Sequence, residues 1–134
     1  MRRANHPDRP DPEPANGPGL RLFRTATLVW VVVIGWLAFR PSTGLEGGLP
    51  WDKANHAVAF VVLTALTGRG WPVLSRTLLV LTMLAAGVGI ELVQGLPSIG
   101  RDADVWDVVA DGVGVAAGLV LLAWLRRRPA GLRE

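Results

Sequence analysis

The sequence predicts an all-α, polytopic membrane protein: a four-transmembrane-helix bundle that follows a disordered polar N-terminal tail. Half of the 134 residues are hydrophobic, and the mean hydropathy is positive, at +0.34. The apolar residues come in long blocks, which are typical of membrane spans. Gly-, Pro- and Arg-rich segments separate four such blocks and mark the connections between helices.

The four blocks form one transmembrane domain, 20–128, between two cytoplasmic tails, 1–19 and 129–134. The first tail is rich in Pro, Asp, Asn, Arg and Gly, so we expect it to be disordered. The expected helices cover about residues 20–40, 52–68, 77–96 and 104–125. Asp52 suits the N-cap of the second helix, and Pro97 ends the third.

The basic residues predict how the bundle is oriented. With the N-terminus in the cytoplasm, most of the fourteen Lys and Arg residues are cytoplasmic, and only Arg40, Lys53 and Arg101 lie outside. The positive-inside rule therefore predicts that both termini are cytoplasmic. Because the arginines flank apolar segments, we interpret the sequence pI near 11 as a topology signal and expect no nucleic-acid partner.

This orientation brings polar side chains from three helix ends to the outer membrane face. They are Asp52, Lys53, His56, Glu91, Gln94, Arg101, Asp104, Asp107 and Asp111. Residues three or four positions apart share a helix face, so Glu91 lies beside Gln94 and Asp107 beside Asp111. An acid inside a transmembrane helix costs roughly 2.5–3.5 kcal/mol on insertion scales, and such acids more often serve function than structure.

Two interpretations of these residues stay open. The functional one is a water-accessible pocket in which a carboxylate, an imidazole and an arginine converge. The structural one is an internal polar network that locks four short helices together. His56 could be a general base or a satisfied histidine that donates to a nearby carboxylate. Arg101 suits an anion such as phosphate, and equally suits pairing with Asp102 or Asp104 in its own loop.

We expect neither a metal nor another cofactor. His56, Glu91, Asp107 and Asp111 offer one imidazole and three carboxylates, but no two of them form a known ligand-spacing motif. The chain has no Cys, which excludes thiolate sites and disulfides. Gly114 and Gly118 form a G-x-x-x-G pattern, which indicates helix packing within the chain first and a homodimer second.

Four motifs, in this order, resemble those of the VanZ-like family of small bacterial integral membrane proteins. They are W-D-K-x-x-H-x-x-x-F-x-x-L at 51–63, E-x-x-Q at 91–94, P-x-x-x-R at 97–101 and D-x-x-x-D-x-x-G-x-x-x-G at 107–118. The resemblance covers roughly residues 22–126. It departs at Asp111, where the family usually has Asn, a side chain that is easier to bury than a carboxylate.

The resemblance implies a multi-pass protein of the bacterial plasma membrane with four or five helices. The family is named for a member associated with reduced susceptibility to teicoplanin, a glycopeptide that targets cell-wall precursors, and no general activity is established for it. The cell envelope is therefore the natural setting for this chain.

We accordingly expect an outward pocket that binds an anionic or lipid-linked envelope ligand. Glu91, Gln94, Asp107 and Asp111 would line it, Arg101 would contact the anion, and Asp52, Lys53 and His56 would form its rim. One alternative is a membrane-embedded hydrolase or transferase that uses His56, Glu91 and Asp107. Another is a structural or assembly subunit of a membrane complex, held together by the polar network.

Overall fold

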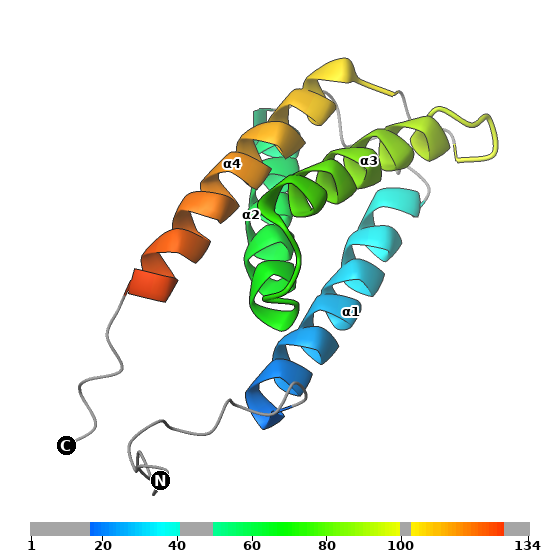
Figure 1. Ribbon diagram of the computed structural model, residues 1–134. Helices are drawn as coiled ribbons and strands as arrows, with labels where there is room; N and C mark the ends of the chain where they lie inside the picture. The colour runs from blue at the N-terminus through cyan, green and yellow to red at the C-terminus, as the bar shows by residue number, and fades with distance from the viewer. Residues whose placement is uncertain (1–16, 41–49, 100–102, 128–134) are drawn as a thin grey trace, which may run out of the picture.

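The computed structural model describes residues 17–40, 50–99 and 103–127. Within these ranges the chain is all-helical, as the sequence predicts (Figure 1). The helices are α1 (Pro18–Phe39), α2 (Pro50–Gly70), α3 (Arg76–Gln94) and α4 (Val105–Arg127). Most of the predicted tails lies outside the described residues, but α1 begins inside the segment that we expected to be disordered.

Local signals explain where the helices begin. Pro18 occupies the first turn of α1, where its missing N–H costs nothing. The Ser75 side chain caps α3 by accepting a hydrogen bond from the Leu78 N–H at 3.1 Å. Asp52 is not the N-cap of α2, because that helix already begins at Pro50; Asp52 lies in the first turn, where the helix dipole favours a carboxylate.

Three of the described helices, α1, α3 and α4, are long and apolar enough to cross a membrane. Many of their large apolar side chains are exposed in the isolated chain, including Val32, Leu92 and Val120. Exposed apolar surface of this extent fits contact with a lipid bilayer. The length and composition of these three helices thus agree with a multi-pass membrane protein. Among the described helices, α2 is not one of the three.

α2 is the central helix and contacts the other three, α4 most extensively. Glycines make the close approach of α4 feasible. A Cβ atom on Gly114 would lie 2.9 Å from the Phe60 Cβ, and one on Gly118 would lie 2.7 Å from the Thr64 Cβ. The G-x-x-x-G pattern therefore packs within the chain. Because α2 covers both glycines, the structure offers no support for a homodimer through Gly114 and Gly118.

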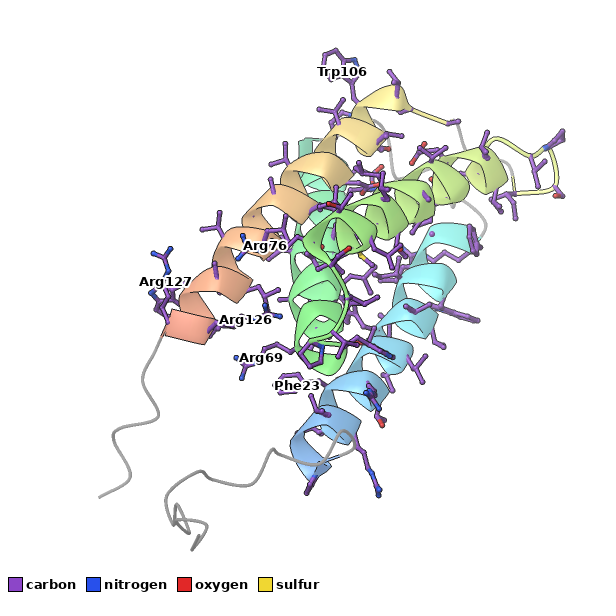
Figure 2. The ribbon with its side chains drawn as sticks, in the orientation of Figure 1. Phe23, Arg69, Arg76, Trp106, Arg126 and Arg127 are labelled. Carbon is purple, nitrogen blue, oxygen red and sulfur yellow. The ribbon has the colours of Figure 1, made fainter. Side chains whose placement is uncertain are left out.

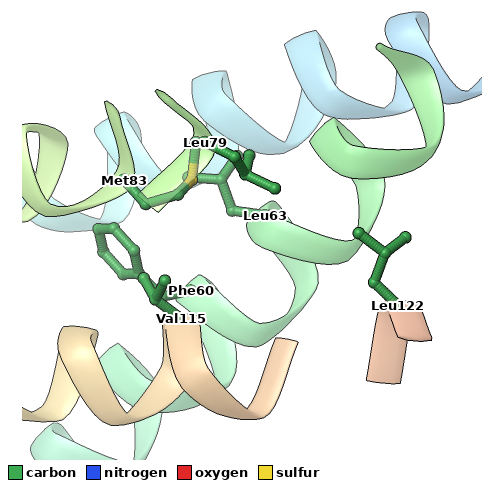
Figure 3. Close-up of a cluster of buried hydrophobic side chains, with 6 residues drawn as sticks. All are labelled: Phe60, Leu63, Leu79, Met83, Val115 and Leu122. Carbon is green, nitrogen blue, oxygen red and sulfur yellow. The ribbon is translucent and has the colours of Figure 1, made fainter. Parts of the chain in front are cut away.

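The hydrophobic core lies one helical turn beyond His56 on α2. Its buried members come from α2, α3 and α4 (Figure 3): Phe60, Leu63, Leu79, Met83, Val115 and Leu122. Trp30 and Ile34 of α1 pack against this core. The Trp30 indole N–H also donates to the Ala59 carbonyl oxygen at 3.0 Å, which fixes α1 against α2.

Arginines gather at the end of the bundle where α1 begins and α2 and α4 end. Arg24 Nε donates to the Gly70 carbonyl oxygen at 2.9 Å, and Arg126 Nη2 donates to that of Gly68 at 2.8 Å. Both bonds satisfy carbonyls in the last turn of α2 that have no partner within the helix. In Figure 2, the labelled residues near this arginine-rich end are Phe23, Arg69, Arg126 and Arg127. Trp106 is labelled at the opposite end of α4.

Candidate functional site

The opposite end of the bundle carries a group of ionisable side chains that we call the polar cluster. Its members are Asp52, Lys53 and His56 of α2, Glu91 of α3, and Asp107 and Asp111 of α4. The first two turns of α2 and of α4 face each other here. Each contributes a pair of residues four positions apart, so the two pairs share one interface. The structure therefore joins most of the residues that the sequence singled out.

His56 and Asp111 form the most buried contact of the polar cluster. His56 Nδ1 lies 3.0 Å from Asp111 Oδ1, and the Asp111 side chain is only 1% exposed. On the other side, a Cβ atom on Gly87 of α3 would lie 2.6 Å from Asp111 Oδ2. The carboxylate is thus seated between a histidine on α2 and a glycine on α3, with no room for a larger residue at position 87.

Lys53 pairs with two carboxylates at the edge of the polar cluster. Its Nζ lies 2.5 Å from Asp104 Oδ2 and 3.0 Å from Asp107 Oδ1. Asp104 precedes α4, and its other oxygen accepts a hydrogen bond from the Trp106 N–H at 2.9 Å. The hydrogen bond from Lys53, helped by that from Trp106, lowers the pKa of Asp104 below its usual value.

Glu91 connects α3 to the start of α4. Its Oε2 accepts a hydrogen bond from the Asp104 N–H at 2.9 Å, and the residue is only 6% exposed. The second oxygen, Oε1, is buried and has no hydrogen-bond partner among the described residues, and the same holds for Asp111 Oδ2. Buried carboxylate oxygens without partners are uncommon, and a bound ion, a water molecule or a proton can account for them.

Gln94 does not join its helix neighbour Glu91 in the polar cluster. Its Nε2 donates to the Ala38 carbonyl oxygen at 3.2 Å, so Gln94 attaches α3 to the end of α1. Arg101, which we expected to contact an anion, lies outside the described residues, as does its neighbour Asp102. The anion contact therefore stays a sequence prediction.

No family model, curated protein or solved structure matches this chain. The VanZ-like resemblance accordingly rests on the four sequence motifs, and the chemistry of the site is argued from its own residues.

The structure adds two residues that the sequence placed less precisely. Asp52, expected at the rim, brings a carboxylate oxygen to within 4.8 Å of a His56 ring nitrogen and of an Asp107 oxygen. Asp104, which was not assigned to the pocket, is the closest partner of Lys53. The four-residue spacing from Asp52 to His56 is the sequence signal that could have linked the first of these to the imidazole.

Carboxylates outnumber cations in this part of the structure. Glu91, Asp104, Asp107 and Asp111 lie around Lys53 and the imidazole of His56. Such a site can hold a cation or protons directly. For it to hold an anion, an additional positive charge from Arg101 or from a bound metal ion would be needed.

Proposed function

We propose that this chain is a VanZ-like protein of the bacterial plasma membrane, with α2 crossing the bilayer beside α1, α3 and α4 and with both termini cytoplasmic. The separation of charge along the bundle supports this orientation. Arg24, Arg69 and Arg126 lie at the end assigned to the cytoplasm, whereas the polar cluster lies at the other. The positive-inside rule assigns the arginine-rich end to the cytoplasm.

In this proposal, the polar cluster forms an outward pocket for an anionic or lipid-linked envelope ligand. The observation that carries the proposal is Lys53, whose partly exposed ammonium group lies at the edge of a cluster of buried acids and, with Arg101, would supply the positive charge that an anion needs. Ionisable groups placed this deep in a membrane helix are costly and generally serve a function. A lipid-linked ligand fits because apolar side chains beside the site, such as Leu92 and Trp106, are exposed and could contact its hydrocarbon chain.

Lys53 and Arg101 are the residues proposed to contact the phosphate of such a ligand. The Lys53 side chain is 43% exposed, so its ammonium group can be reached from outside the bundle. A lipid-linked cell-wall precursor is the ligand class that would connect this chain to teicoplanin susceptibility.

Cysteine labelling tests the orientation. The sequence has no native Cys, so single cysteines at positions 53, 101 and 127 can be compared without background. A membrane-impermeant maleimide should label positions 53 and 101 in intact cells and position 127 only after permeabilisation. Labelling of positions 53 and 101 from opposite compartments would eliminate the common outward pocket.

Binding of polyprenyl phosphate in lipid nanodiscs tests the ligand class. Lys53→Met and Arg101→Ala should each weaken saturable binding at least tenfold. Arg127→Ala, at the other end of α4, is the matched control because it also removes one cation and should leave binding unchanged. Equal binding by all three variants would count against the proposal.

The second candidate is a membrane-embedded hydrolase or transferase, which the His56–Asp111 contact favours. An aspartate on one ring nitrogen of a histidine leaves the other nitrogen available as a general base. Glu91 and Asp107 would assist as acid or polarising groups. His56→Gln and Glu91→Gln should then abolish glycopeptide resistance in a cell-based assay while the purified variants stay folded, and retained resistance would exclude this candidate.

The third candidate is a structural or assembly subunit, favoured by the bonds that Glu91 and Gln94 make to other helices. In that case Glu91→Gln and Asp107→Asn should chiefly lower the yield and the melting temperature. Variants of normal stability that lose the cellular phenotype would argue against it.

A further inference from the structure

We propose that Asp52, His56 and Asp107 form a binding site for a first-row divalent metal ion, such as Zn²⁺ or Mn²⁺, in which Asp111 orients the histidine ligand. The inference uses the polar cluster but does not depend on an envelope ligand. It also revises the sequence-based expectation of no metal, which considered Asp107 and Asp111 but not Asp52.

The donor atoms already lie near one another. One ligand atom from each of Asp52, His56 and Asp107 falls within 4.8 Å of the other two. His56 Nε2 and Asp107 Oδ2 are 3.9 Å apart. Two ligands that bind one Zn²⁺ ion at roughly 2.0–2.2 Å each lie at most about 4.3 Å apart, so this pair needs little movement. Imidazole and carboxylate together suit Zn²⁺, Mn²⁺ and related ions.

Asp111 supplies a second observation that points to a metal ligand at His56. Its carboxylate is fully buried and Oδ1 is aimed at the imidazole, whereas Oδ2 lies on the Gly87 side and has no hydrogen-bond partner among the described residues. In the neutral tautomer whose Nδ1–H donates to Asp111, Nε2 is unprotonated, and this nitrogen faces Asp107. Metal-binding histidines commonly donate the far ring N–H to a carboxylate in this way, which fixes their tautomer and ring orientation.

The two oxygens of Asp107 have different neighbours. Lys53 occupies Oδ1 of Asp107, whereas Oδ2 of the same carboxylate faces His56. Glu91, which is 6% exposed, also keeps an oxygen without a hydrogen-bond partner among the described residues. A divalent ion between α2 and α4 would place positive charge beside these buried carboxylates.

Metal titration of the full chain in detergent tests the inference. Protein stripped with EDTA is titrated with ZnCl₂ and MnCl₂ by calorimetry, and with CoCl₂ by visible absorption, without any lipid phosphate. We expect one ion per chain for the wild type. His56→Gln and Asp107→Asn should weaken binding at least tenfold. Asp104→Asn is the matched control: it removes the same charge beside Lys53 but no ligand, and its affinity should stay within threefold of wild type.

Asp111→Asn distinguishes an orienting carboxylate from a bystander. It removes no ligand, yet affinity should fall by roughly 10- to 100-fold, as is typical when the carboxylate partner of a metal-bound histidine is lost. Where His56→Gln fails to fold, Asp52→Asn, in the partly exposed first turn of α2, provides the ligand test.

Absence of saturable binding by the wild type, or wild-type affinity in the His56→Gln and Asp52→Asn variants, would overturn the inference. Because polyprenyl phosphate is absent from the titration, a negative result here leaves the envelope-ligand proposal standing, and failure of that proposal leaves a metal site intact.

Discussion

Asp111 Oδ1 lies 3.0 Å from His56 Nδ1, and Gly87 of the third helix closes the other side of the carboxylate. Charge and shape are therefore matched at the same point: an imidazole partners the acid, and a missing side chain makes room for it. This contact joins α2 to α4 more deeply than the pairs made by Lys53, whose side chain is 43% exposed.

Replacing Asp111 should destabilise the bundle because it leaves His56 without its buried partner. We expect Asp111→Ala to lower the free energy of unfolding by about 3–5 kcal/mol, the range for breaking a buried pair from one side. Asp111→Asn keeps an acceptor and should cost less. Equilibrium unfolding in mixed detergent micelles, followed by circular dichroism, measures both. Equal losses for the two variants would show that the hydrogen bond is not what matters.

The glycines of α4 provide a matched test of close packing. Gly114→Ala should cost about 1–3 kcal/mol, because the new Cβ would lie 2.9 Å from that of Phe60. At Gly112, the nearest atom to such a Cβ is Leu84 Cδ2, at 3.9 Å. Gly112→Ala should therefore be neutral or stabilise the helix by up to about 1 kcal/mol. The same unfolding assay checks both, and similar losses would contradict the described contact of α4 with α2.

Acid should weaken the contact between Lys53 and Asp104. The hydrogen bond from Lys53 lowers the pKa of Asp104, so folding is favoured by this group above the unfolded pKa of about 3.9. That contribution is lost as the pH falls through the lower, folded pKa. The difference in melting temperature between wild type and Asp104→Asn should thus be constant at neutral pH and shrink below about pH 4. A difference in melting temperature that grows as the pH falls would contradict this prediction.

Two neighbouring arginines test the other end of the bundle. Arg126 Nη2 donates to the Gly68 carbonyl oxygen at 2.8 Å. Arg126→Ala should therefore lower the free energy of unfolding by about 1–2 kcal/mol, since the carbonyl loses a charged donor. Arg126 and Arg127 are both exposed, but the described bond to Gly68 is made by Arg126. Arg127→Ala therefore removes the same charge with little expected effect. Comparable losses from both would indicate a general charge effect in place of a specific cap.

The sequence predicted helices because each apolar block is long and lies between segments rich in Gly, Pro or Arg. For α3, Pro97 lies three residues beyond the last helical residue, whereas the Ser75 cap at its start was not predicted. The four-residue spacing of Asp107 and Asp111 likewise placed them on one face of α4, toward the other acids. Rules of this kind can be applied because they depend on the sequence of a single helix.

The partner of each acid could not be predicted in the same way. Asp111 contacts His56, whereas Asp107 contacts Lys53, and this choice depends on how far α4 is shifted along α2. Gly114 and Gly118 set this shift because α2 packs closely against both. Such packing between two helices cannot be inferred from the sequence of one helix. The partner of Gln94 could not be predicted either, because one face of α3 contacts both α1 and the polar cluster.

The helix that carries His56 is the central one, yet it is not among the three that are apolar enough to cross a membrane. During synthesis, α4, which supplies both the glycines and the aspartates that receive α2, is made after α2 and α3. In our proposal, a nascent chain that stops after α3 would leave α2 without its main binding surface. Stable integration of the second segment therefore has to await α4, and the site is assembled only after that helix has been made.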